Sequence, residues 1–328
     1  MSLASFLSAI KYILIDHDAS DALIKDDLTS RFNDLTDDEL TDLLSLKKDR
    51  LDIYRRSIFG GRLSMIRKRL PVSFFIINKF LSSHLSGYQT LDLATHYERF
   101  SSWKARSTLS YLANFSKFIE FKYPNIASQF PFIIQLIDFE LLGVKIIRDP
   151  FKATQPLAIE SYLLSELLDK FFFINSITKF FQSEFNLLNI RRSYFNHTDF
   201  NNADLNNAGS FLEQLNDSKV NSLNAKGDFC YVGGRSLEGD LQWFNISSRV
   251  YNFLLTKSTS KESLENLKPL GQITDDSNIQ ASSNPNSTIS SLFEVILEDN
   301  NFEESEEVLK KILSLISDLS NAQIISIK

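Results

Sequence analysis

The chain has 328 residues, of which 43% are hydrophobic, and its formal net charge is −6 at pH 7. This length suffices for two domains of ordinary size, and the acidic balance argues against a chain that as a whole binds nucleic acid or an anionic membrane. Cys230 is the only cysteine, which excludes an internal disulfide and any metal site built from several cysteines. We therefore expect a cytoplasmic protein.

The N-terminal half has the pattern of successive helices. Residues 3–15 are apolar but too short to span a bilayer, and they lack the basic start and cleavage site of a signal peptide. Thr36 and Glu39 have the spacing of a capping box and predict the start of a helix, which the glycines at 60 and 61 interrupt or bend. Pro71 suits the first position of the next helix.

Residues 129–147 show the clearest helical periodicity of the chain. Their apolar residues follow i, i+3, i+4, i+7 spacing and form one stripe: Phe130, Ile133, Ile134, Ile137, Leu141 and Val144. We expect other helices to cover this stripe. Residues 1–148 are therefore predicted to form one helical domain.

The pattern changes in the second half. Pro150 and Pro156 mark a connector over residues 149–186, in which residues 158–172 are expected to form a short helix between the domains. Strand patterns follow at residues 187–195, 228–234 and 240–246, and the last two are separated by a glycine-rich turn.

The remaining residues complete a predicted domain over 187–328. Polar stretches at 196–227 and 258–288 are expected to be mobile insertions, helices are predicted at 247–257, 290–300 and 306–320, and residues 323–328 can add a short strand. The predicted class is α+β, with an all-helical N-terminal domain followed by a small three-stranded antiparallel sheet with helices. Such a module is similar to a peptide recognition element or a winged helix.

Candidate catalytic residues are scarce. The histidines at 17, 84, 96 and 197 have no metal-binding spacing, and the glycines form neither a P-loop nor a dinucleotide fingerprint. Cys230 lies in a predicted strand, where a small buried hydrophobic residue is more common than a nucleophile. We expect no catalytic residue, metal or cofactor in this chain, although an enzyme whose residues meet only in space stays an open alternative.

A basic cluster lies in residues 55–69 without an intervening acidic residue. Such a run can bind phosphates, an acidic protein surface or only water. Because the chain as a whole is acidic, nucleic acid is disfavoured, and an acidic protein partner is the preferred interpretation of this cluster. The candidate interface residues are Arg55, Arg62, Arg67 and Arg69.

The strand predicted at 240–246 is the candidate ligand site. If this strand lies at the edge of the sheet, its free N–H and C=O groups can pair with an incoming peptide, and the last helix can form the other wall of a groove. The candidate peptide-binding residues are Asp240, Leu241, Gln242, Trp243, Phe244 and Asn245, together with Val308, Leu309, Ile312 and Ile316.

Several segments carry a family resemblance. LDIYRRSIFGGRLSMIRKRLP with FFIINKFLSSHL resembles a "YRRN…FP" region, with Leu70-Pro71 in place of FP; YLANFSKFIEF and FPFIIQLIDFE resemble a "FxxFL" helix and a "LxxLE" helix that places Glu140 at the acidic position. SEFNLLNIRRSYF, DFCYVGG and LQWFNIS resemble the second domain of the same proteins. These are the partner proteins of multinuclear iron oxidases in methanobactin-type and related pathways that modify ribosomally made peptides (RiPP biosynthesis).

The resemblance implies a non-catalytic subunit of a heterodimer. It would bind the leader of a precursor peptide by strand addition and present the core to a TIM-barrel oxidase, whose own iron ions modify cysteine. The alternative is a nucleic-acid-binding regulator with a winged-helix-like C-terminal domain, since helices followed by a short β element at 289–328 also suit that fold.

Overall fold

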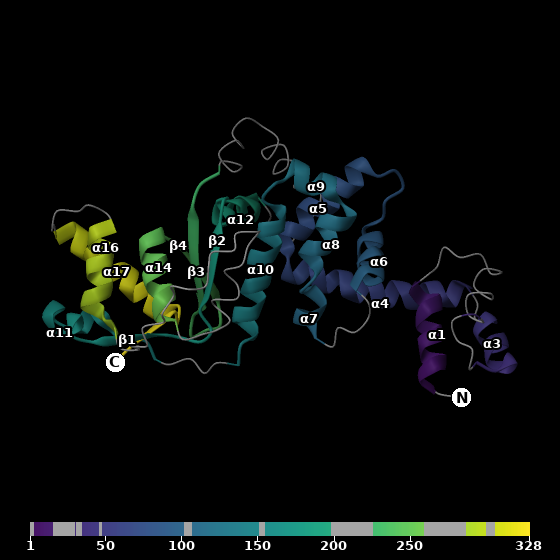
Figure 1. Cartoon of the computed structure of the whole chain (residues 1–328), viewed down its shortest axis with the longest axis horizontal. Coiled ribbons are helices and arrows are strands. Elements are labelled where there is room, and N and C mark those ends of the chain that lie inside the picture. Colours follow the sequence, from purple (N-terminus) through teal and green to yellow (C-terminus); the bar gives the residue numbers. More distant parts are fainter. Residues whose placement is uncertain are drawn as a thin grey trace, which may run out of the picture. The chain divides into compact units, whose positions relative to one another are not determined.

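The computed structural model describes residues 3–15, 30, 35–45, 48–101, 107–150, 155–197, 226–258, 287–299 and 306–328. The chain divides into two compact units, Met1–Ile126 and Ala127–Lys328. The predicted α+β class is confirmed, because helices make up the described first unit and the second combines helices with two small antiparallel sheets (Figure 1). Except at their ends, the predicted insertions at 196–227 and 258–288 lie outside the described residues.

The first unit is built from helices whose starts follow the sequence signals. At the start of α3 the Thr36 N–H donates to Glu39 Oε2 (2.8 Å) and the Glu39 N–H donates to Thr36 Oγ1 (3.3 Å), which confirms the capping box. Pro71 is the first residue of α5, as predicted. The helices are α1 (Leu3–Ile15), α3 (Asp37–Leu44), α4 (Lys48–Arg69), α5 (Pro71–His84), α6 (Thr90–Ser101), α7 (Thr108–Leu112) and α8 (Phe115–Lys122), with α9 (Pro124–Gln129) crossing the boundary between the units.

Helix α4 corrects one expectation, because it runs without interruption through Gly60 and Gly61. A glycine inside a helix costs only about 0.5–1 kcal/mol relative to alanine. The packing of α4 on α5 and α6 outweighs this cost, since Phe59 and Ile66 along its inner side are buried, as is Leu70 directly after its end.

The second unit contains two three-stranded antiparallel sheets. One has the order β5-β1-β6 and the other the order β2-β3-β4. Its strands are β1 (Phe171–Ile174), β2 (Lys179–Ser183), β3 (Phe229–Arg235), β4 (Leu241–Ile246), β5 (Ser287–Thr288) and β6 (Ile325–Ile327). Its helices are α10 (Ile133–Arg148), the 3-10 turn η1 (Ile159–Ser161), α11 (Leu164–Leu168), α12 (Leu187–His197), α14 (Ser248–Lys257), α16 (Ile289–Asp299) and α17 (Glu306–Asn321).

Helix α10 belongs to the second unit, whereas the sequence placed it in a helical domain ending at 148. It packs against β2, β3 and β4 (Figure 1). The sheet contacts a side of α10 that is separate from the predicted stripe, because Phe139, which is not a stripe residue, places its ring against the rings of Tyr231 and Trp243. Ile133, Ile137 and Val144 of the stripe are buried as well, so α10 is enclosed on more than the side that faces the sheet.

Two predicted elements of the second half are wrong. Residues 187–195, expected as a strand, form helix α12, because Asn186 Oδ1 accepts the Asn189 N–H at its start and Leu187 and Ile190 are buried at helical spacing. The helix predicted at 158–172 is instead η1, the short α11 and the start of β1. The strands expected at 228–234 and 240–246, and the short C-terminal strand, are confirmed as β3, β4 and β6.

The segment 322–324 joins the two sheets. The Asn175 side-chain amide donates to the Gln323 carbonyl (2.7 Å) and Thr178 Oγ1 donates to the Ile324 carbonyl (3.1 Å). A Cβ at Gly234 of β3 would lie 2.1 Å from the Ala322 carbonyl oxygen. The glycine is therefore needed for this close approach of one sheet to the chain that enters the other.

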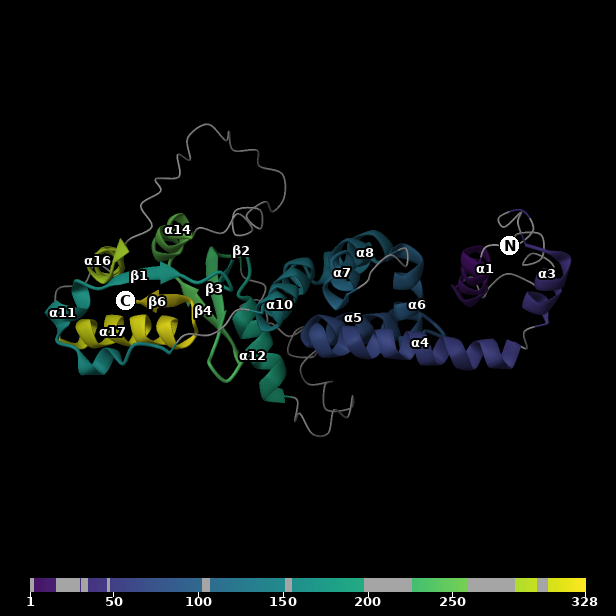
Figure 2. The same ribbon diagram turned by 90° about the horizontal axis from the view of Figure 1, so that it is seen from below.

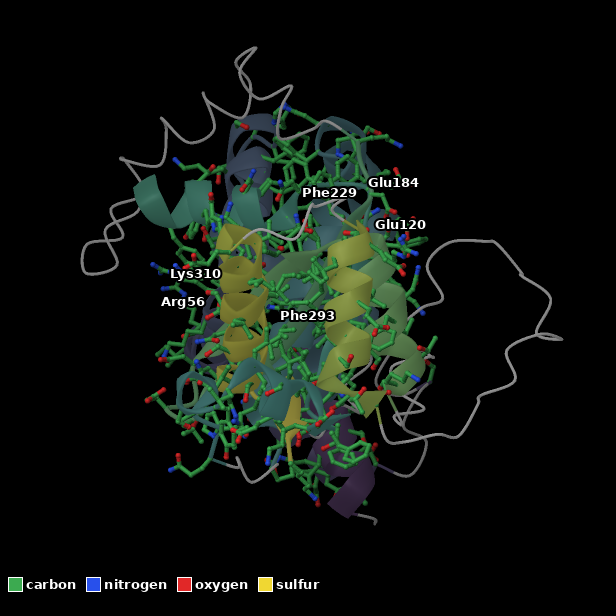
Figure 3. All side chains as sticks on the ribbon, turned by 90° about the vertical axis from the view of Figure 1, so that its left-hand side faces the viewer. Arg56, Glu120, Glu184, Phe229, Phe293 and Lys310 are labelled. Carbon is green, nitrogen blue, oxygen red and sulfur yellow. The ribbon has the colours of Figure 1, made fainter. Side chains whose placement is uncertain are left out.

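A hydrophobic core lies in the second unit on the side of the sheet β2-β3-β4 away from α10. It is formed by side chains of α14, α16 and α17 together with both sheets, and Phe293 of α16 lies between α16 and α17 (Figure 3). Helix α17 runs beside β6 (Figure 2).

Gly234→Ala is expected to lower the free energy of unfolding by about 3 kcal/mol, since the added methyl group meets backbone that cannot move aside. Gly61→Ala is the matched control. Its Cβ meets nothing within 4 Å on α4, so stability should rise by about 0.5–1 kcal/mol. Urea unfolding followed by circular dichroism measures both, and an unaltered Gly234→Ala protein would contradict this packing.

Candidate functional site

The hairpin between β3 and β4 fixes which backbone groups of β4 face outward. The Ser236 N–H donates to the Asp240 carbonyl (2.9 Å) and the Gly239 N–H donates to the Ser236 carbonyl (3.0 Å). Gly239 has a φ of 95°, so it occupies the left-handed position that closes a three-residue hairpin loop. Ser236 and Asp240 are thus a directly bonded pair.

Bonded and non-bonded pairs alternate along an antiparallel ladder. Counting from Ser236 and Asp240, the pair Arg235 and Leu241 is non-bonded and the pair Gly234 and Gln242 is bonded. The backbone N–H and C=O groups of Gln242, Phe244 and Ile246 consequently point toward β3. Those of Leu241, Trp243 and Asn245 point away from it.

No strand in the described part of the chain pairs with this outer side of β4, whose only ladder is the one with β3. The opposite edge of the sheet, β2, is a poorer candidate, because Lys179, Phe180 and Ser183 on it are buried. Strand β4 also carries none of the features that protect exposed edges from pairing: its sequence LQWFNI has no charge and no proline, and its register with β3 has no bulge.

The side chains of β4 hold it in place from both faces. On one face the Trp243 ring lies 4.3 Å from the Phe139 ring of α10, and a Cβ at Gly143 would lie 2.7 Å from Leu241 Cδ2. On the other face Ile246 belongs to the hydrophobic core and Phe244 packs against it. The strand is therefore anchored from both faces, and no described strand pairs with its outer backbone.

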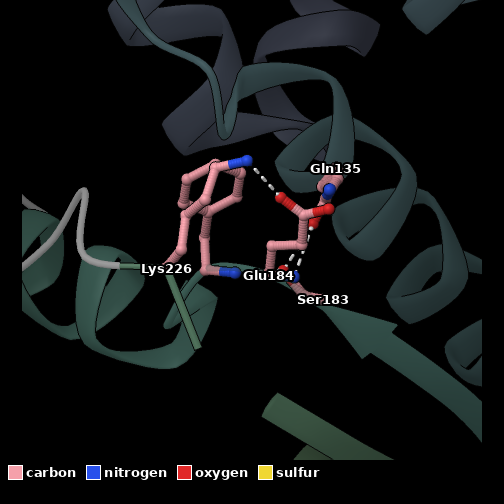
Figure 4. A network of polar contacts seen from close by, with 5 residues as sticks. Gln135, Ser183, Glu184 and Lys226 are labelled. Carbon is pink, nitrogen blue, oxygen red and sulfur yellow. Dashed lines mark hydrogen bonds and ion pairs between the residues drawn. The ribbon is translucent and has the colours of Figure 1, made fainter. Parts of the chain in front are cut away.

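The first turn of α10 is bound to the end of β2 by a polar network (Figure 4). Gln135 Oε1 accepts hydrogen bonds from Ser183 Oγ (2.6 Å) and from the Glu184 N–H (3.2 Å), and Lys226 Nζ pairs with Glu184 Oε2 (2.7 Å). Helix α10 thus contacts the sheet at both of its edges.

The helix side of the predicted groove needs correction. Val308, Ile312 and Ile316 are buried in the core of the second unit, and Leu309 packs against it. These α17 side chains are occupied within the fold and do not form a free wall beside β4. Of the other candidate peptide-binding residues, Asp240 closes the hairpin. Within β4, only Leu241, Trp243 and Asn245 have backbone groups that point away from β3.

The candidate interface arginines of α4 also differ from one another. Arg62 Nε lies 3.4 Å from Glu98 Oε1, whose side chain is buried, and its guanidinium lies 4.7 Å from the centre of the Tyr111 ring. Arg62 therefore makes its contacts within the first unit. Arg67 is exposed and Arg69 is half-buried, while the Arg55 side chain lies outside the described set.

Cys230 is buried in β3, as expected from its strand pattern. Burial, together with the nearby Asp228 carboxylate, raises the pKa of the thiol from 9.0 to about 12. The thiol accordingly stays protonated near neutral pH and is a poor nucleophile, since the thiolate is the reactive form.

Comparison with known protein families and with curated proteins finds no match to this chain. Within the described ranges, no cluster of three or more His, Cys, Asp or Glu side chains is arranged to hold a metal ion. None of the described helices combines the length and hydropathy needed to cross a membrane.

Cys230 should react with a thiol reagent at least about a hundredfold more slowly in the native protein than in the urea-unfolded chain. The folded state holds the thiol proton more tightly, so this group's stabilising contribution is complete below pH 9 and declines as the pH rises toward 12. Reaction rates measured with and without urea test this, and equal rates would contradict the burial of Cys230.

Arg62→Ala is expected to lower the free energy of unfolding by about 1–3 kcal/mol, because it removes the cation that lies 3.4 Å from the buried Glu98 carboxylate. Arg67→Ala, which removes an exposed arginine from the same helix, should change it by no more than about 0.5 kcal/mol. Urea titrations of the two variants make the comparison. Equal effects would show that the pair with Glu98 has no structural role.

Proposed function

We propose that this chain is a peptide-binding protein that receives an extended segment of another polypeptide along the outer edge of β4. The observation that supports this is the combination of an anchored strand with outward backbone groups at Leu241, Trp243 and Asn245 that no described strand covers. An uncharged edge of this kind is suited to strand addition.

The geometry defines how a peptide would pair. In an antiparallel arrangement each outward residue exchanges both of its hydrogen bonds with one peptide residue. Since a net hydrogen bond contributes only about 0.5–1.5 kcal/mol, the backbone alone gives modest affinity. Side-chain contacts must add to this backbone affinity. Apolar surface for alternate peptide side chains is supplied by the half-buried Leu241 and Trp243. The exposed Ile147, on the same face of α10 as Gly143, adds to that surface.

The specific role we propose is the one implied by the family resemblance. The bound segment is the leader of a ribosomally made precursor peptide, and the chain presents the core of that peptide to an iron-dependent TIM-barrel oxidase that modifies cysteine. In this role the chain is an accessory subunit, and the iron and the chemistry belong to the partner enzyme. The protonated, buried Cys230 thiol supports a non-catalytic role for the one thiol of the chain.

Asn245→Pro tests the proposed edge directly. Proline removes an N–H that faces away from β3, and proline is tolerated on edge strands where the N–H faces solvent. The variant should fold, yet bind the leader of a short cysteine-containing peptide encoded beside its gene at least about tenfold more weakly, a loss of about 1.4 kcal/mol. Fluorescence anisotropy with a labelled leader measures the affinity.

Asn245→Ala is the control, because it shortens the same exposed side chain and keeps the backbone N–H. It should bind like the native chain. If Asn245→Pro and Asn245→Ala bind the leader equally well, the peptide does not use this edge.

A further inference from the structure

The outer face of α4 is a second surface, and it lies in the other unit. With 3.6 residues per turn, the exposed residues of this helix fall within about half of its circumference. They are Ile53, Tyr54, Arg56, Ser57, Gly61, Ser64, Arg67 and Lys68. We call this set the outer face of α4. Arg62 and Arg69, which the sequence assigned to the interface, lie on the inner half of the helix.

The charges of the outer face are unbalanced. Residues 53–69 contain no acidic residue. Arg62 is paired with Glu98, but no ion pair with the described chain involves Arg56, Arg67 or Lys68. Three exposed cations on one helix face thus form no ion pair with the described residues, in a protein whose net charge is −6.

The same face exposes apolar side chains and bare backbone. Ile53 is 67% exposed and Tyr54 is 63% exposed, which is unusual for large apolar residues on a helix that packs on α1, α5 and α6. A Cβ at Gly60 or Gly61 would meet nothing within 4 Å. Because these glycines carry no side chain, the backbone of another helix can approach the backbone of α4 closely between the cations.

We propose that the outer face of α4 docks an acidic, amphipathic helix of a partner protein. Carboxylates of that helix pair with Arg56, Arg67 and Lys68, and its apolar side chains cover Ile53 and Tyr54. A second copy of α4 does not suit the surface, because its cations would face like charges. The exposed Ile53 and Tyr54 favour a protein over nucleic acid, whose backbone offers only charge to such a face.

This proposal does not rest on the peptide-binding edge, because α4 and β4 belong to different units and their variants are separate. The probe is a synthetic amphipathic helical peptide, labelled with a fluorophore, with glutamates on one face and leucines on the other. A peptide of the same composition with the leucines scattered around the helix is its control. The full chain should bind the first more tightly, and added salt should weaken that binding.

Charge reversal at Arg56, Arg67 and Lys68 to Glu should weaken binding of the amphipathic peptide at least about tenfold. Reversal of three other exposed cations, Lys117, Lys122 and Arg192, changes the net charge equally and should leave the affinity within about twofold. Equal weakening by both triple variants would overturn the proposal, as would equal binding of the two peptides or tighter binding of duplex DNA than of the amphipathic peptide.

Gly61→Leu tests the close packing of a partner helix without changing any charge on the outer face of α4. The leucine has room in the free protein and improves helix propensity, so the thermal midpoint should stay the same or rise. The leucine also raises the centre of the outer face and should block the approach of a partner helix. Unchanged affinity of Gly61→Leu for the amphipathic peptide would show that no helix packs there.

Discussion

The architecture of the second unit depends on the packing of one aromatic ring. Phe139 of α10 contacts a residue of each strand in the sheet β2-β3-β4: its ring centre lies 5.5 Å from that of Phe181, 5.1 Å from that of Tyr231 and 4.3 Å from that of Trp243. Aromatic pairs at such distances contribute about 0.5–1.5 kcal/mol each beyond burial. A three-stranded sheet is too small to be rigid alone, and this helix gives it a common support.

Two missing side chains make that packing possible. The Trp243 ring covers Gly233 of β3, where a Cβ would lie 2.5 Å from the indole, and Leu241 fills the space beside Gly143. The bulky residues of the edge strand thus sit in hollows that the glycines leave. An edge strand held in this way loses little further freedom when a peptide joins it, which favours binding.

The elements that the sequence predicted best are those whose signals are local. The capping box at Thr36 and Glu39, the proline at the start of α5 and the glycine-rich hairpin between β3 and β4 all specify their own backbone conformation. The segments 171–174 and 179–183 were missed as strands, because short apolar runs rich in phenylalanine suit a buried helix equally well. The Asn175 turn between them was the available signal, since the Thr178 N–H donates to the Asn175 carbonyl.

The candidate site was only partly predictable for a similar reason. That β4 would lie at an edge was a guess about strand order, which depends on contacts distant in sequence. The α17 residues were misassigned because an amphipathic stripe does not state what covers it, and here the core of the unit does. The interface on α4 stays a prediction, but its basic residues were predicted as one cluster, whereas a helix distributes them over opposite sides.

The loop at Leu237, Glu238 and Gly239 has a wider consequence. Because backbone direction alternates along a strand, the length of this loop determines which half of the β4 residues faces outward. Side-chain face and backbone direction alternate together along a strand, so a one-residue shift of register that turned the even positions outward would also turn Leu241 and Trp243 away from α10. The hairpin loop and the seat of these two side chains therefore select the same register, and an incoming chain always meets the odd-numbered residues of β4.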